Sequence, residues 1–169
     1  MNNSATKRKQ NLLSTPLGYF LIVGGTMILG FLSGLLSGSN RGYTGFTRPP
    51  LTPPDTVFAI VWPVLYFMIG NSLFFILKSE PSASTFRIRR ISIILWVIQL
   101  VLNLTWPFIF FAASLPTFAF IVLSLLDAAV LALIIFTFML DKTAAWLLIP
   151  YGVWIAFATY LNLFIALYN

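Results

Sequence analysis

The sequence predicts an all-α membrane protein, a single bundle of five transmembrane helices. Its composition leads to this class, because 59% of its 169 residues are hydrophobic and only 8% are charged, whereas a soluble domain carries about 25% charged residues. Apolar runs of the length that spans a bilayer, about 20 residues, follow one another along the chain. High aromatic content and the lack of alternating apolar and polar positions favour helices over the strands of a membrane barrel.

The predicted spans follow an N-terminal tail, residues 1–15. They cover residues 16–37, 55–77, 91–111, 116–140 and 143–168. The last three spans are joined by very short turns, so neighbouring helices there must form antiparallel hairpins. The connection between the first two spans, residues 38–54, is long. Long ordered loops are often functional, and we expect this one to act as a lid.

Basic residues predict the orientation, because Lys and Arg collect in cytoplasmic loops. With a cytoplasmic N-terminus, the inner side carries Lys7, Arg8, Lys9, Lys78, Arg87, Arg89, Arg90 and Lys142, and the outer side carries Arg41 and Arg48. An odd number of spans then places the C-terminus outside. The formal charge of +6 follows from this bias, so we expect no nucleic-acid binding.

The sequence contains no cysteine and no histidine. Disulfides, thiol chemistry and the common zinc sites are therefore excluded. Only Tyr and Met remain as side chains that could bind a haem iron. A bound tetrapyrrole is then expected to be free-base, or held by its faces and edges. We expect no metal site and no obligatory cofactor.

The most informative tract runs from Arg41 to Gly70, with the sequence RGYTGFTRPPLTPPDTVFAIVWPVLYFMIG. It begins as a polar loop stiffened by glycine and proline, and continues as an apolar helix that carries Trp62 and Tyr66 one turn apart. A rigid loop at the mouth of an aromatic helix suits a lidded pocket for a flat, apolar ligand.

Two further spans carry polar and aromatic residues at helical spacing. These stripes are Gln99, Asn103 and Trp106 on the third span, and Tyr151, Trp154, Ala158 and Asn162 on the fifth. Residues at this spacing share one helix face. The stripes could converge with Trp62 and Tyr66 on one cavity, where amides orient a ligand and indoles stack on it. Interfacial anchoring or simple helix packing explains the aromatic residues equally well.

Asp127 is the only acidic residue in the interior of a predicted span. A charged Asp at that depth costs about 2.5–3.5 kcal/mol, so we expect it to face the bundle interior. There it could hydrogen-bond a neighbouring helix, carry a proton or donate to a ligand. Pro150 removes a backbone donor beside Trp154, and a kink is expected there.

Gly30, Gly34 and Gly38 form two overlapping G-x-x-x-G patterns on the first span. Such patterns permit the close approach of another backbone. They could form a dimer seam, pack inside the bundle or make room for a bulky ligand.

Taken in order, these motifs resemble the TspO/MBR family, which comprises the tryptophan-rich sensory proteins of bacteria and the mitochondrial translocator protein. The motifs are Arg48-Pro49-Pro50 with Pro53-Pro54, VWPVLYFMIG at 61–70, QLVLNLTWPFIFF at 99–111, Asp127, and AAWLLIPYGVWIAFATYLN at 144–162. They cover nearly the whole chain after the first 15 residues. The resemblance implies a five-helix bundle, usually a homodimer, with a pocket between the helices that the first long loop closes.

The resemblance also implies a ligand class. The family binds porphyrins, including protoporphyrin IX, and drug-like isoquinoline carboxamides or benzodiazepines. A light- and oxygen-dependent degradation of protoporphyrin has been proposed for some members, and the two tryptophans implicated in it fall on Trp62 and Trp154, which are candidate catalytic residues. The lid tyrosine falls on Tyr43, the pocket amide on Asn103 and the pocket alanine on Ala158. The full expected ligand-binding set is Tyr43, Arg48, Pro53, Trp62, Tyr66, Gln99, Asn103, Trp106, Asp127, Tyr151, Trp154 and Ala158.

The chain departs from the family pattern at a few positions. Leu51 stands where the loop motif often has Trp, and Gly42 replaces the aromatic residue before the lid tyrosine; both bear on how tightly the lid grips a ligand. No Lys or Arg follows Tyr160 or Tyr168, so the cholesterol consensus is missing. We expect no cholesterol specificity.

The sequence thus predicts a membrane receptor or sensor for porphyrins, in which Arg41 or Arg48 could pair a propionate carboxylate. Light-dependent porphyrin degradation is an enzymatic alternative that rests on the resemblance alone. Transport of porphyrin or another small apolar solute is a further alternative, disfavoured by the lack of an internal repeat. The expected partners are an aromatic ligand, membrane lipid and a second copy of the chain, in a bacterial plasma membrane.

Overall fold

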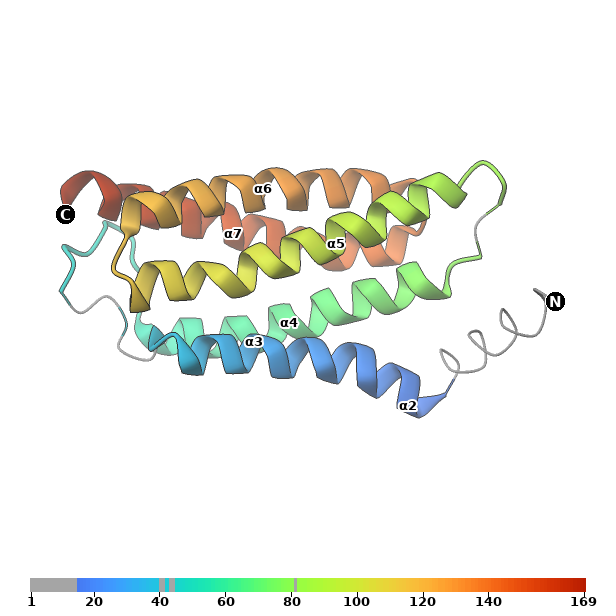
Figure 1. Cartoon of the computed structure of the whole chain (residues 1–169), viewed down its shortest axis with the longest axis horizontal. Helices are drawn as coiled ribbons and strands as arrows, with labels where there is room; N and C mark the ends of the chain where they lie inside the picture. Colours follow the sequence, from blue (N-terminus) through green and yellow to red (C-terminus); the bar gives the residue numbers. More distant parts are fainter. Residues whose placement is uncertain (1–14, 40–41, 43–44, 81) are drawn as a thin grey trace.

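The computed structural model describes residues 15–39, 42, 45–80 and 82–169. Within these residues the chain forms five long helices that lie side by side in an elongated bundle (Figure 1). They are α2–η1–α3 (Pro16–Tyr19, Phe20–Gly24 and Gly25–Leu36), α4 (Asp55–Lys78), α5–η3 (Phe86–Pro107 and Phe108–Ala112), α6 (Pro116–Phe138) and α7 (Lys142–Tyr168), where η1 and η3 are π-helical turns. Each helix is long and apolar enough to cross a bilayer. The predicted five-helix membrane bundle is confirmed, and the chain is a multi-pass integral membrane protein.

The third helix begins at Phe86 rather than at the predicted Ile91. Its first turns are basic and resemble a loop in the sequence. Arg89 shows why they are helical, because its guanidinium donates from Nε to the Ile76 carbonyl at 3.1 Å and from Nη2 to the Leu77 carbonyl at 2.5 Å. Both carbonyls lie in the last turn of α4, where carbonyl groups have no backbone N–H partner within the helix. The added turn of α5 therefore caps the end of α4.

Short-range signals fix the other helix ends. The Thr15 hydroxyl accepts from the Gly18 N–H at 3.1 Å, and the Asp141 carboxylate accepts from the Ala144 N–H at 2.8 Å, which begins α7. Both are N-cap hydrogen bonds, which satisfy donors at the start of a helix. Pro116 occupies the first position of α6, where its missing N–H costs nothing.

The helices form a closed ring. The order around the ring is α3, α4, α7, α6 and α5, and the contact between α5 and α3 completes it. The Ser33 hydroxyl closes this ring by donating to the Leu104 carbonyl at 2.7 Å. The segment after α3 and the end of α7 lie at one end of the bundle (Figure 1), which we call the loop end. Residues 79–80, 82–85 and 139–141 lie at the opposite end of the bundle.

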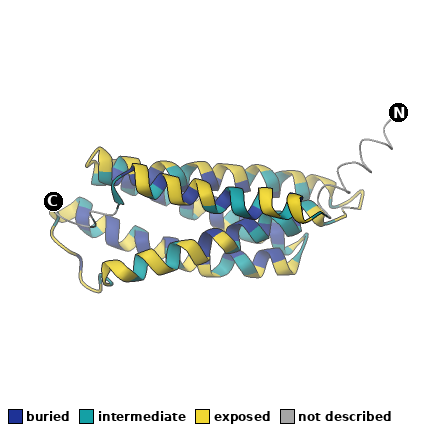
Figure 2. Ribbon diagram, turned by 90° about the horizontal axis from the view of Figure 1, so that it is seen from below, coloured by how far each residue is buried: buried dark blue, intermediate teal, exposed yellow. Residues whose placement is uncertain are grey.

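Buried residues line the inside of the ring, whereas the outward faces are exposed and apolar, as expected for helices surrounded by lipid (Figure 2). Glycines allow the closest helix contacts. A Cβ on Gly30 would overlap the Tyr66 ring, and a Cβ on Gly70 would lie 2.9 Å from the Val23 Cα. Of the three alternatives for the G-x-x-x-G pattern, packing inside the bundle is therefore the one that applies to Gly30. Gly38, with φ of +75°, follows the end of α3.

Candidate functional site

Four side chains from α4 and α7 form an aromatic cluster towards the loop end. Phe58 contacts Trp154 edge-on, with ring centroids 5.5 Å apart, and Trp62 stacks on Tyr66 at 5.6 Å. Phe58, Trp62 and Trp154 are each half-buried and pack against the buried core. The two tryptophans that the family resemblance singled out therefore lie on adjacent helices, and Phe58, one helical turn before Trp62 on α4, contacts Trp154.

A chain of buried hydrogen bonds continues from this cluster and joins three helices. Tyr66 Oη donates to Asn103 Oδ1 at 2.5 Å, Asn103 Nδ2 donates to Tyr151 Oη at 3.1 Å, and Tyr151 Oη donates to Gln99 Oε1 at 2.8 Å. We call these four residues the polar chain. Each donor orients the next acceptor, so a satisfied network of this kind rigidifies the interior. The polar chain therefore holds the Tyr66 ring, and with it the stacking surface for Trp62.

Two donors in this region have no hydrogen-bond partner among the residues that the structure describes. They are the indole Nε1 of Trp154, in the aromatic cluster, and the Nε2 of Gln99, at the end of the polar chain; both atoms are buried. A buried donor without an acceptor costs about 1–3 kcal/mol. These N–H groups could therefore donate to an acceptor on a molecule that enters the bundle.

Trp106 belongs to a different cluster from the other predicted site residues. Its Nε1 donates to Asn162 Oδ1 at 2.9 Å, and Asn162 Nδ2 donates to the Pro116 carbonyl at 2.8 Å. The Trp106 ring also stacks on Phe110, with centroids 5.2 Å apart. These contacts tie the ends of α5 and α7 to the start of α6. Ala158, in contrast, is buried on α7 one turn beyond Trp154.

Asp127 hydrogen-bonds between helices. Its Oδ2 accepts from the Thr159 hydroxyl at 2.7 Å, which joins α6 to α7. This is the helix-to-helix bond that was one of the alternatives for this residue. The partner is neither in the aromatic cluster nor in the polar chain.

The loop after α3 carries three predicted site residues. Tyr43 lies outside the described residues, as does Arg41. Pro53 is half-buried. Arg48 pairs with Asp55, the first residue of α4, at 3.5 Å between Nη2 and Oδ2, and both side chains are more than half exposed. Exposed ion pairs are weak, so Arg48 remains able to exchange its partner.

The described part of the loop is attached to the ends of α5 and α7. The Tyr160 hydroxyl donates to the Pro50 carbonyl at 3.1 Å, and Asn169 Oδ1 accepts from the Thr47 N–H at 2.7 Å. Phe46 packs on Phe110, with centroids 5.4 Å apart. Sequence reasoning missed these contacts, which join residues far apart in the chain. It also missed Phe58, although Phe58 precedes Trp62 by one helical turn and so extends the same stripe.

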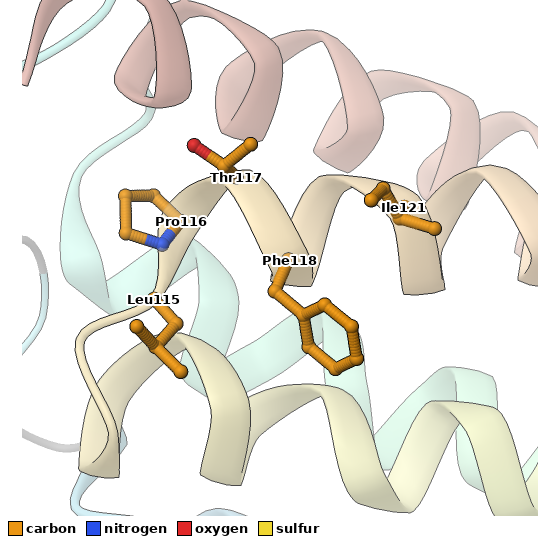
Figure 3. Close-up of a pocket in the computed structure, with 5 residues that line it drawn as sticks. All are labelled: Leu115, Pro116, Thr117, Phe118 and Ile121. Atoms are coloured by element: carbon orange, nitrogen blue, oxygen red, sulfur yellow. The ribbon is translucent and has the colours of Figure 1, made fainter.

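A surface hollow of about 270 Å³ lies at the turn between α5 and α6, away from the aromatic cluster (Figure 3). It is lined by Leu115, Pro116, Thr117, Phe118 and Ile121, none of which is a predicted site residue. Phe118 and Ile121 are exposed on the outer face of α6. In the aromatic cluster Phe58 is in contact with Trp154, and Trp62 with Tyr66, so a ligand that enters between these paired rings must displace them.

Comparison with known proteins agrees with the family resemblance that the sequence motifs indicated. The sequence profile of the TspO/MBR family matches residues 22–168. The tryptophan-rich protein TspO of Chlorobaculum tepidum is 32% identical over 120 residues, which cover 71% of this chain and 74% of that protein. TspO of Archaeoglobus fulgidus is 35% identical over 133 residues (75% and 79%), and the human translocator protein is 34% identical over 122 residues (72% and 71%). The predicted resemblance is confirmed: this chain belongs to the TspO/MBR family.

Proposed function

We propose that this protein is a membrane receptor or sensor that binds a flat tetrapyrrole of the protoporphyrin IX class against the aromatic cluster. The observation that carries the proposal is the position of Trp62 and Trp154. They lie on adjacent helices, each with its ring half-buried, and the buried N–H of Trp154 has no partner in the described structure. Half-buried rings with a free donor suit a ligand that is apolar on its faces and carries hydrogen-bond acceptors.

Each part of such a ligand has a counterpart in the chain. Indole and phenyl rings would stack on the macrocycle, and aromatic pairs contribute about 0.5–1.5 kcal/mol each beyond the area that they bury. The Trp154 N–H would donate to an acceptor on the ring or its edge. Arg48 would exchange its exposed bond to Asp55 for a propionate carboxylate, where Arg can make two parallel hydrogen bonds.

Binding requires the loop to move. Phe58 and Trp154 are in contact, and residues 46–54 are attached to α7 through Tyr160 and Asn169. We infer that the ligand enters when the loop leaves α7, and that the loop closes again over the bound ring. The loop then sets the rates of entry and release more than the depth of the site does.

We also propose that light and oxygen degrade the bound porphyrin with the help of Trp62 and Trp154. Support comes from the stacking of Trp62 on Tyr66, which places an oxidisable phenol beside an indole. Aerobic illumination of the complex should bleach the porphyrin absorbance faster in the wild type than in the variant that carries both Trp62→Phe and Trp154→Phe. Equal bleaching in the two proteins would remove the enzymatic part of the proposal.

We propose that the protein lies in a bacterial plasma membrane, with the loop end of the bundle outside and the opposite end in the cytoplasm. Among the described residues, Lys78, Arg87, Arg89, Arg90 and Lys142 lie at or near the opposite end, and Arg48 lies at the loop end. This distribution follows the positive-inside rule. A homodimer is proposed from family membership.

Protoporphyrin IX titrated against tryptophan fluorescence tests the binding proposal. We expect saturable quenching, with an affinity at least about fivefold weaker when Trp62 and Trp154 are both replaced by Phe, since about 1 kcal/mol of stacking and hydrogen bonding is lost. Trp146→Phe is the matched control, because Trp146 is 63% exposed and packs on Phe138 near the opposite end. No saturable quenching, or the same affinity in the double variant as in the control, would overturn the proposal.

A further inference from the structure

Two hydrogen bonds fix the register of α4 against α5 in the half of the bundle away from the loop. Trp96 Nε1 donates to the Ile69 carbonyl at 3.1 Å, and Arg89 Nε donates to the Ile76 carbonyl at 3.1 Å. The acceptors lie two helical turns apart on α4, and the donors lie two turns apart on α5. The stretch between these bonds is therefore aligned on both helices.

A serine occupies that stretch on each helix. Ser72 lies between the two acceptors on α4, and Ser92 lies between the two donors on α5. Both residues are 0% exposed, and neither hydroxyl has a hydrogen-bond partner in the described structure. Since the register aligns them, the two hydroxyls lie at about the same depth in the bundle.

Three other hydroxyls on the membrane-spanning helices bond a carbonyl of their own helix. Thr26 donates to the Ile22 carbonyl at 2.7 Å, Thr105 to the Val101 carbonyl at 2.7 Å, and Ser124 to the Phe120 carbonyl at 2.9 Å. Each bond reaches back one turn, which is the usual local option for a helical Ser or Thr. Ser72 and Ser92 do not use this option, although it is open to a helical serine, so both buried hydroxyls are left available to another partner.

We propose that Ser72 and Ser92 form a binding site for water between α4 and α5. A hydroxyl both donates and accepts, which matches water, and buried water in proteins typically makes about three hydrogen bonds to groups that would otherwise lack partners. Thr137 of α6 is also fully buried and has no partner for its hydroxyl in the described structure, but it lies next to the end of its helix, so the proposed site consists of the two serines. The site is separate from the aromatic cluster and does not depend on the proposed function.

X-ray radiolysis of the full-length protein in lipid nanodiscs tests this site, because bound water is converted to hydroxyl radicals that oxidise the nearest side chains. Trp96 is the reporter and Trp106 the internal reference, since they are 5% and 8% exposed and their N–H groups are both bonded. We expect Trp96 to be oxidised at least threefold faster than Trp106. Oxidation of Trp96 at or below the rate of Trp106 would overturn the proposal.

The variant with both Ser72→Ala and Ser92→Ala should lower the Trp96 oxidation rate to that of Trp106. Ser124→Ala is the matched control, because this hydroxyl already bonds within its own helix, and the Trp96 rate should not change. An unchanged Trp96 rate in the double variant contradicts the assignment of the site to these serines. Thermal unfolding gives a second readout: removing water-bridging hydroxyls should lower the midpoint, whereas removing hydroxyls that bind nothing should leave it unchanged or raise it.

Discussion

The interior contains two pairs of tryptophans that differ in what their indole N–H groups do. Trp96 and Trp106 are buried, and each N–H donates to an acceptor on another helix. Trp62 and Trp154 are half-buried on adjacent helices, and the N–H of Trp154 is buried with no partner in the described structure. The first pair cross-links helices, whereas the second pair has partly exposed ring surface and a donor that, in the proposed function, would meet a ligand. The state of the indole, more than the residue type, therefore distinguishes structure from binding.

Replacing Trp106 by Ala should give the largest effect. It removes a buried ring and leaves the Asn162 carbonyl oxygen without its donor, so we expect a loss of about 3–5 kcal/mol in the free energy of unfolding. Denaturant unfolding in detergent micelles measures this loss. Trp146→Ala, at an exposed position, is the control and should cost less than about 0.5 kcal/mol. If Trp62→Ala cost as much as Trp106→Ala, the distinction between the two pairs would fail.

Replacing Gly30 by Ala should disturb Trp62 of the second pair through its stacking partner Tyr66. The added Cβ overlaps the Tyr66 ring, so the ring must leave its stack with Trp62 and its bond to Asn103. We expect a loss of about 1–3 kcal/mol in stability together with weaker protoporphyrin binding. Gly25→Ala is the matched control, because its Cβ meets nothing within 4 Å and Ala favours a helix over Gly by about 0.5–1 kcal/mol. Equal stability of the two variants would contradict the close packing of Gly30.

Conservative Phe substitutions separate the two pairs most directly. Trp96→Phe leaves the Ile69 carbonyl without its donor and should cost about 1–3 kcal/mol of stability. Trp154→Phe removes a buried donor that has no partner, whose unpaired state costs about 1–3 kcal/mol, so the stability should stay the same or rise, while the affinity for protoporphyrin IX falls by about fivefold, or roughly 1 kcal/mol. Thermal unfolding and fluorescence titration measure the two quantities. Comparable losses of stability in both variants would show that the two pairs of tryptophans do not differ in their structural role.

The smallest effect is expected at the loop. Tyr160→Phe removes the hydroxyl that bonds the Pro50 carbonyl, so the loop should leave α7 more often. The rate of ligand dissociation should rise about two- to fivefold, as expected for the loss of about 0.5–1 kcal/mol from one exposed hydrogen bond. Stopped-flow dilution of the complex measures this rate. Tyr168→Phe, whose ring already packs on Phe164, should leave it unchanged.

The helices were predictable from the sequence because the bilayer fixes the length of each apolar run. The exception was the start of the third helix, where the sequence FRIRR is too basic to be read as part of a span. Its helical form depends on the reach of Arg89 to carbonyls of α4, and composition carries no trace of this contact. Spacing also placed Gln99 and Asn103 on one helix face, as found.

Spacing was less successful for the candidate site, because it assigns a face but no partner. Trp106 shares a face with Asn103, yet it bonds Asn162 and joins a separate cluster. Asp127 likewise bonds Thr159, away from the aromatic cluster. The attachment of the loop to Tyr160 links residues that are 110 positions apart, and no local sequence pattern predicts such a contact.

The short turns 113–115 and 139–141 also determine how the molecule can deform. They leave α5, α6 and α7 almost no freedom to shift against one another, so these three helices should behave as one body. The first helix and α4 connect to that body only through the longer segment between α4 and α5. They meet it between α4 and α7, where Phe58 contacts Trp154, and between α3 and α5, where Ser33 bonds the Leu104 carbonyl. Any movement of the first helix and α4 away from the other three helices would therefore have to break contacts in both places.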